Sequence, residues 1–197
     1  MRILRAVCVY CGSSTGRNPL YAERAARLGE RLGREGLGLV YGGGNVGLMG
    51  IVADAVLAAG GEVIGVIPEQ LVGWEVAHRG LTRLEVVATM HERKARMFDL
   101  SDAFVALPGG FGTLDEMFEM LTWRQLGLGD KPCAFLDVDG YYTPLMAMLA
   151  RMLAEGFLRE EHLADLWHGE DIDAMLGWMR RDRPDASRDR KLRKDQR

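Results

Sequence analysis

The stretch Leu107-Pro-Gly-Gly-Phe-Gly-Thr-Leu-Asp-Glu116 connects an apolar run to an amphipathic one and decides how the 197-residue chain is interpreted. A strand that ends here and enters a helix near Thr113 exposes backbone N–H groups at the helix start, where the helix dipole also favours an anion. The glycines let a ligand approach the backbone closely. The stretch therefore predicts a phosphate-binding turn, with Thr113 capping the helix and Glu116 one turn further along.

Two further turns of the same kind occur earlier in the chain. The cluster Tyr41-Gly-Gly-Gly-Asn-Val-Gly-Leu-Met-Gly50 follows a β-like run and leads into a helix, and Cys11-Gly-Ser-Ser14 follows the first predicted strand. A single glycine-rich turn can serve only the sterics of a strand-to-helix connection. Three turns at the carboxyl ends of parallel strands would line one crevice, so their combination favours a binding site.

Short apolar runs alternate with helical patterns along the whole chain. Continuous apolar runs such as Cys133-Ala-Phe-Leu136 are typical of strands covered on both faces. The sequence therefore predicts an α/β fold, a doubly wound parallel sheet with helices on both faces in a single domain. Strands are expected near residues 5–11, 37–41, 62–67, 84–88, 103–107 and 133–137, and helices near 19–35, 47–59, 89–100, 113–126, 143–155 and 171–181.

The composition suits one globular domain, because 48% of the residues are hydrophobic and the net charge is only −3. Nucleic-acid binding is not expected, since no field of one sign is present. Arg2 and Arg5 lead directly into a short strand, which leaves no signal-peptide core or membrane-spanning run. We expect a cytoplasmic protein without membrane association. The domain is predicted over residues 1–181, followed by a charged, disordered tail over residues 182–197.

The three cysteines are predicted to pack in the core. Cys8-Val-Tyr-Cys11 has the C-x-x-C spacing of redox and metal sites, but Cys8 lies inside one apolar run and Cys133 inside another. No second pair is available to complete a four-ligand zinc site. We therefore expect neither a metal nor a cofactor.

Two segments between the glycine turns carry candidate side chains. The connection over residues 68–84 is too long for a simple crossover, and Glu75 within it is either a ligand contact or a solvated carboxylate. The helical run Met90-His-Glu-Arg-Lys-Ala-Arg-Met97 directly precedes the strand that leads into the phosphate turn. Arg93 can therefore reach the same crevice as Glu116, where a guanidinium suits phosphate, ribose or a developing charge.

Together these motifs resemble the LONELY GUY family of cytokinin-activating enzymes. The resemblance covers residues 5–180 and rests on Tyr41-Gly-Gly-Gly44 with Gly47-Leu-Met-Gly50, Met90-His-Glu-Arg-Lys94 and Pro108-Gly-Gly-Phe-Gly-Thr-Leu-Asp-Glu116. It implies a Rossmann-like homodimer that cleaves the N-glycosidic bond of cytokinin riboside 5′-monophosphates, and often of AMP. The products would be the free base and ribose 5-phosphate.

The resemblance also implies roles for individual residues. Arg93 and Glu116 fall on the family's catalytic pair. Family members have often been labelled lysine decarboxylases, but nothing in this sequence singles out a Schiff-base lysine. The implied nucleotide contacts are Glu75, Lys94, Gly110, Phe111, Gly112, Thr113 and Thr122, and the glycine-rich turns add Ser14, Gly43, Gly44 and Gly109.

Loss of a base from ribose builds positive charge around the anomeric carbon. Glu116 could stabilise that charge, hold the ribose hydroxyls or orient the attacking water, while Arg93 could orient the sugar phosphate or Glu116 itself. One alternative is a non-catalytic carrier of a nucleotide or of the molybdenum cofactor with the same fold, against which the Arg93 and Glu116 pair argues. A phosphotransferase would need a Gly-Lys-Ser/Thr ending that neither glycine cluster has.

Overall fold

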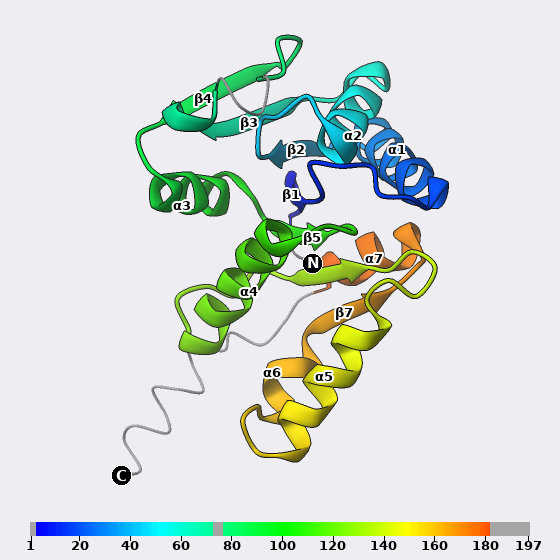
Figure 1. Ribbon diagram of the computed structural model, residues 1–197, viewed down its shortest axis with the longest axis vertical. Coiled ribbons are helices and arrows are strands. Elements are labelled where there is room, and N and C mark those ends of the chain that lie inside the picture. Colours follow the sequence, from blue (N-terminus) through cyan, green and yellow to red (C-terminus); the bar gives the residue numbers. More distant parts are fainter. Residues whose placement is uncertain (1–2, 73–76, 182–197) are drawn as a thin grey trace.

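The computed structural model describes residues 3–72 and 77–181. These form a seven-stranded sheet with helices on both faces (Figure 1). None of the helices in these residues is both long and apolar enough to cross a membrane.

In chain order the elements are β1 (Ala6–Tyr10), α1 (Pro19–Arg34), β2 (Gly38–Tyr41), α2 (Gly47–Ala58), β3 (Val63–Pro68), the short 3₁₀ helix η1 (Glu69–Leu71), β4 (Arg83–Val87), α3 (Met90–Leu100), β5 (Ala103–Ala106), α4 (Phe111–Leu126), β6 (Cys133–Leu136), α5 (Thr143–Ala154), α6 (Glu160–Ala164), β7 (Leu166–Gly169) and α7 (Ile172–Met179).

All seven strands are parallel and follow the order β4-β3-β2-β1-β5-β6-β7. Strand β1 is central, with Cys8 paired to Val40 of β2 on one side and to Phe104 of β5 on the other. The chain builds outward from β1 to β4 and then returns to start again at β5. The strand order therefore reverses between β1 and β5, which is where open α/β sheets bind ligands.

Each face of the sheet has its own apolar core. Val7 and Val9 pack on one face with α1, α2 and α7, while Cys8 and Tyr10 pack on the other with α3 and α4. Successive side chains of a strand point to opposite faces, so a strand covered on both sides is apolar throughout. This confirms the predicted doubly wound sheet. The prediction for the cysteines is also confirmed, because all three are buried free thiols.

Besides the short helices η1 and α6, which are not among the predicted elements, two details differ from the sequence-based expectation. The sequence analysis missed β7, whose residues Leu-Trp-His-Gly are only half apolar and which lies at the edge of the sheet beside β6. Helix α4 starts at Phe111, with Gly110 at the N-cap position and no side-chain cap. The predicted capping role of Thr113 is therefore wrong, since Thr113 lies buried inside the first helical turn.

Candidate functional site

A crevice of about 330 Å³ opens at the carboxyl edge of the sheet. This volume is at the lower end of the range for small-molecule sites. The turns after β1 and β5 both contribute, as predicted, whereas the turn after β2 contributes only through α2. The lining residues are Cys11, Gly12, Ser13, Met49, Leu71, Met90, Arg93, Gly110, Phe111, Gly112, Thr113, Asp115 and Glu116.

The glycines around the start of α4 have different roles. A Cβ atom added to Gly110 or Gly112 would meet nothing within 4 Å, so open space borders the start of the helix. A Cβ atom on Gly109 would lie 2.7 Å from the Cβ of Thr113 and 2.9 Å from the backbone nitrogen of Gly12. Gly109 is therefore required for packing, whereas Gly110 and Gly112 leave room beside backbone N–H groups that lack intrahelical acceptors.

Arg93 lies inside the crevice wall and is held mainly by backbone carbonyls. Only 6% of the residue is exposed. Its Nε donates to the carbonyl of Val66 at 3.1 Å and its Nη2 to the carbonyl of Gly42 at 3.3 Å. A buried guanidinium is tolerated when its donors are satisfied, so these contacts from β3 and from the end of β2 fix where the positive charge lies.

Glu116 faces Arg93 from α4. Its Oε1 lies 3.8 Å from Nη1 of Arg93, and the two side chains are only 12% and 7% exposed. Lys94 of α3 also contacts α4, because its Nζ lies 2.7 Å from Asp115 and 2.9 Å from Glu119. Charged side chains thereby link helices α3 and α4 beside the crevice. The prediction that Arg93 and Glu116 reach the same crevice is confirmed, because both side chains line it.

Lys94 and Cys11 are poorly suited to act as nucleophiles. Burial alone would lower the pKa of Lys94, but the carboxylates of Asp115 and Glu119 outweigh burial and raise that pKa. Burial raises the pKa of the Cys11 thiol well above its usual range. A reactive amine or thiol needs a lowered pKa, so neither group is activated in this environment.

Gly42 is a contributor that the sequence analysis missed. Its carbonyl accepts from Arg93, and a Cβ atom added to it would overlap the guanidinium. The run Tyr41-Gly-Gly-Gly44 has the pattern of a phosphate-binding turn, yet its first glycine makes room for a side chain from α3. No local pattern separates these two uses of glycine.

Several predicted contacts lie away from the crevice lining. Ser14 accepts a hydrogen bond from the backbone of Gly16, and it is the neighbouring Ser13 that lines the crevice. The hydroxyl of Thr122 donates to the carbonyl of Phe118, one turn earlier in α4, and Thr122 does not line the crevice. Glu75 lies outside the described residues. The crevice lining also does not include Gly43, Gly44, Gly109 or Lys94. Gly43 and Gly44 instead contact residues 77–78.

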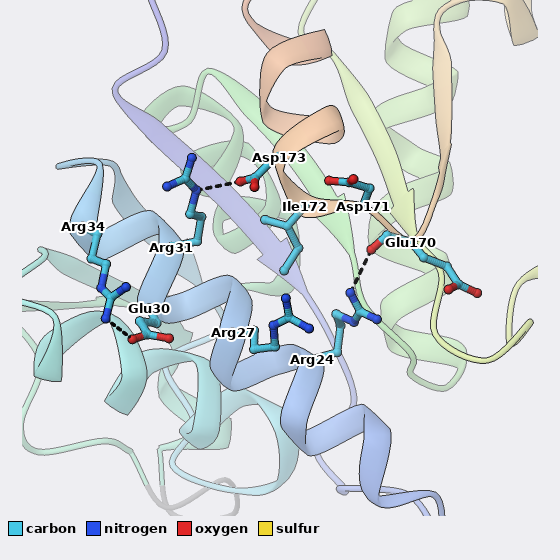
Figure 2. Close-up of a pocket in the computed structure, with 9 residues that line it drawn as sticks. All are labelled: Arg24, Arg27, Glu30, Arg31, Arg34, Glu170, Asp171, Ile172 and Asp173. Atoms are coloured by element: carbon cyan, nitrogen blue, oxygen red, sulfur yellow. Dashed lines mark hydrogen bonds and ion pairs between the residues drawn. The ribbon is translucent and has the colours of Figure 1, made fainter.

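A larger hollow of about 440 Å³ lies between α1 and the start of α7 and shares no lining residue with the crevice (Figure 2). Figure 2 shows Arg31 directed at Asp173 and Arg34 at Glu30. The lining contains four arginines and four carboxylates, so its charges largely balance. The crevice at the strand-order reversal is therefore the better candidate site. The hollow is lined by Arg24, Arg27, Glu30, Arg31, Arg34, Glu170, Asp171, Ile172 and Asp173.

Known proteins match most of the chain. A family model described as "possible lysine decarboxylase" matches residues 49–176. A probable cytokinin riboside 5′-monophosphate phosphoribohydrolase of Oryza sativa subsp. japonica is 49% identical over 155 residues, which cover 79% of this chain and 70% of the relative. A cytokinin riboside 5′-monophosphate phosphoribohydrolase of Rhodococcoides fascians is 46% identical over 177 residues, covering 89% of each protein.

A solved structure shares the fold at lower sequence identity. The molybdenum cofactor binding protein of the phototrophic bacterium Rippkaea orientalis aligns with a TM-score of 0.67 and 22% identity. The alignment covers 90% of this chain and 96% of that protein. At this level of identity the likeness concerns the architecture, so the choice between binding and catalysis rests on the side chains in the crevice.

The different surroundings of Gly109 and Gly112 predict opposite effects of the same substitution. Gly109→Ala should lower the free energy of unfolding by about 1–3 kcal/mol, because the new methyl group collides with Thr113 and Gly12. Gly112→Ala should leave that free energy unchanged or raise it by up to about 1 kcal/mol, since the site is helical and open. If the nucleotide site that the family resemblance implies lies in this crevice, the affinity of the Gly112→Ala variant for AMP should fall on the order of tenfold, because the added methyl group would occupy space beside the N–H groups at the start of α4.

Urea denaturation and calorimetric titration with AMP measure both quantities for each variant. A Gly112→Ala protein that binds AMP like the wild type would show that AMP does not bind against the start of α4.

Proposed function

Because this chain belongs to the LONELY GUY family, we propose that it hydrolyses the N-glycosidic bond of cytokinin riboside 5′-monophosphates and of AMP, releasing the free base and ribose 5-phosphate. One observation carries the proposal. The crevice combines a buried Arg93 beside Glu116 with open space along Gly110 and Gly112 at the start of α4.

The start of α4 is the proposed site of the 5′-phosphate. The dipole of this 16-residue helix and its unsatisfied N–H groups favour an anion there. Gly110 and Gly112 border open space, so phosphate oxygens can approach the backbone without meeting side chains. Thr113, at the same mouth, is a further candidate contact. The phosphate would thereby anchor the nucleotide and direct its ribose along the crevice.

Glu116 is the proposed stabiliser of the transition state. When the bond between C1′ and the base breaks, positive charge develops on C1′ and the ring oxygen, and a carboxylate nearby lowers the energy of that state. Water then bonds to C1′ through its oxygen and loses a proton, while the departing base takes one up. Atoms and charge balance, and no group becomes attached to the protein.

Arg93 is proposed to keep the carboxylate of Glu116 oriented. The carbonyls of Val66 and Gly42 hold the guanidinium firmly, so it offers a fixed positive charge facing Glu116 from the crevice wall. A group fixed in this way does not have to reorganise during the reaction, which is how preorganised charges accelerate it.

A pyridoxal-phosphate-dependent decarboxylase, which the description of the family model suggests, is the less favoured reading. A Schiff-base lysine needs a lowered pKa, whereas the carboxylates beside Lys94 raise its pKa. Lys131, the other lysine in the described residues, donates to the carbonyl of Phe98 and lies over the ring of that residue, outside the crevice lining. A non-catalytic carrier would have no use for a carboxylate beside a buried guanidinium.

The proposal predicts that the purified protein releases adenine from AMP and acts poorly on adenosine. The phosphate turn supplies interactions that the nucleoside lacks, and such remote binding energy is used to hold the reacting centre in place. Chromatography of the products after incubation with each compound measures both rates. Similar turnover of AMP and adenosine would contradict a phosphate-anchored mechanism, and no adenine from either would favour the carrier.

Substitutions at the charged pair should separate catalysis from binding. Glu116→Gln keeps the shape of the side chain but removes its charge, and we expect turnover to fall on the order of 10²–10⁴-fold. We expect the turnover of the Arg93→Ala variant to fall by a similar factor. The AMP dissociation constant of each variant should change much less, because the phosphate is held by backbone groups.

The matched control is Glu119→Gln, which removes a carboxylate from the same helix that pairs with Lys94 and does not line the crevice. It should retain most of the turnover. Single-turnover release of adenine, calorimetric AMP binding and circular dichroism are measured for all three variants. Near-normal turnover in a folded Glu116→Gln protein would refute the catalytic assignment.

We further propose that the protein is a cytoplasmic homodimer that acts on free nucleotides and not on nucleic acid. The family resemblance supports the dimer, and so do large apolar side chains that are more than half exposed at Leu126, Leu128, Met148 and Phe157. Light scattering should give about twice the 21.9 kDa mass of one chain. A mass near that of one chain at micromolar concentration would contradict the dimer.

A further inference from the structure

Two consecutive tyrosines hold carbonyl groups of the phosphate turn from outside the crevice. The hydroxyl of Tyr142 donates to the carbonyl of Leu107 at 2.6 Å, and the hydroxyl of Tyr141 donates to the carbonyl of Gly109, also at 2.6 Å. Tyr142 is buried, whereas Tyr141 is 39% exposed. Neither tyrosine lines the crevice, so their contacts act on the turn and not on a ligand.

The carbonyl between these two is held as well. The backbone N–H of Gly12 donates to the carbonyl of Pro108 at 3.1 Å. Three successive carbonyl groups, from Leu107 to Gly109, therefore each have a donor outside the turn. This part of the backbone is fixed peptide by peptide, although its sequence would otherwise make it one of the most adaptable segments of the chain.

The contact at Gly109 determines the direction of a neighbouring donor. In a planar trans peptide the carbonyl of one residue and the N–H of the next point in opposite directions. Tyr141 holds the Gly109 carbonyl, so the N–H of Gly110 points away from Tyr141. Gly110 is the N-cap residue of α4 and lines the crevice, which makes its N–H a donor for an anion bound there.

The peptide between Gly109 and Gly110 can flip more readily than one between residues with side chains. Both of its residues are glycines, and a Cβ atom at Gly110 would meet nothing within 4 Å, so side-chain packing does not fix Gly110. A flip would replace the N–H with a carbonyl oxygen, which repels a phosphate. A single hydroxyl that holds the carbonyl can therefore decide whether the mouth of the crevice attracts or repels an anion.

Tyr141 is itself well fixed although it is partly exposed. Its ring makes edge contacts with Tyr21 and Tyr142, with centroids 5.6 and 5.0 Å apart. It also follows a tight turn in which Asp139 has a φ of 55° and one carboxylate oxygen of Asp137 accepts two backbone N–H groups. The hydroxyl is thus presented to Gly109 by a rigid support.

We propose that Tyr141 is a positioning residue of the phosphate site. Its hydroxyl keeps the peptide between Gly109 and Gly110 oriented with the N–H toward the crevice, so the affinity for a phosphate monoester depends on an oxygen atom outside the site. This inference rests on the proposed function and extends it to a residue on the loop after β6.

Tyr141→Phe removes only the hydroxyl oxygen and tests the proposal directly. The dissociation constant for AMP, measured by calorimetry, should rise on the order of tenfold. KM for AMP should rise with it while kcat changes little, because the phosphate is held equally in the ground and transition states. Turnover of adenosine and the melting temperature should stay close to those of the wild type.

Tyr21→Phe is the matched control, since this neighbouring tyrosine contacts the ring of Tyr141 but its hydroxyl makes no hydrogen bond with any residue that the structure describes. It should bind AMP like the wild type. Tyr141→Phe with unchanged AMP affinity overturns the proposal, as does an equal loss of activity toward AMP and adenosine. Wild-type protein that binds AMP without releasing adenine contradicts the proposed hydrolysis and leaves the comparison of affinities valid.

Discussion

Two backbone hydrogen bonds at Gly12 hold the carboxyl edge of the sheet together. Its N–H donates to the carbonyl of Pro108 at 3.1 Å, and its carbonyl accepts the N–H of Leu48 at 3.0 Å. Gly12, the second residue after β1, thus joins the turn after β5 to the start of α2. A Cβ atom on Gly12 would lie 2.9 Å from the carbonyl oxygen of Ser14, and one on Gly47 would overlap the backbone of Ser13. Much of the glycine in these turns therefore serves contact between backbones, which in turn shapes the crevice.

The same edge contains a buried positive charge, which would be costly without partners. Removing a guanidinium from water costs several kcal/mol unless its donors are satisfied. For Arg93, the carbonyls of Val66 and Gly42 satisfy much of that need, and Glu116 lies at 3.8 Å, longer than a hydrogen-bonded ion pair. The position of Arg93 depends on the backbone of β2 and β3 more than on Glu116. The two opposite charges therefore face each other without closing into a tight pair, which suits side chains that act on a substrate.

Local patterns predicted the architecture well, and contacts between distant residues account for what they missed. The six predicted strands are continuous apolar runs or lie between clear turn residues, whereas β7 is a half-apolar edge strand that forms because β6 offers it a partner. Arg93 and Glu116 could be predicted because each lies in a recognisable motif. Gly42 and Tyr141 could not, since one makes room for a guanidinium 51 residues away and the other reaches a carbonyl 32 residues away. Contacts between residues so far apart in the chain produce no periodic pattern or fixed spacing in the sequence.

Helix α4 is proposed to serve both binding and chemistry, and its geometry explains how one element can do so. Its first residue, Phe111, lies where an anion is favoured, and Glu116 follows five residues later, a rise of about 7.5 Å at 1.5 Å per residue. Helical side chains lean back toward the N-terminus, which reduces this separation to roughly the span of a ribose phosphate. A phosphate bound at the helix start would therefore bring the anomeric carbon near the carboxylate without any loop movement. The turn after β5 sets where the nucleotide binds, and a charged residue within the second turn of α4 determines what can happen to it.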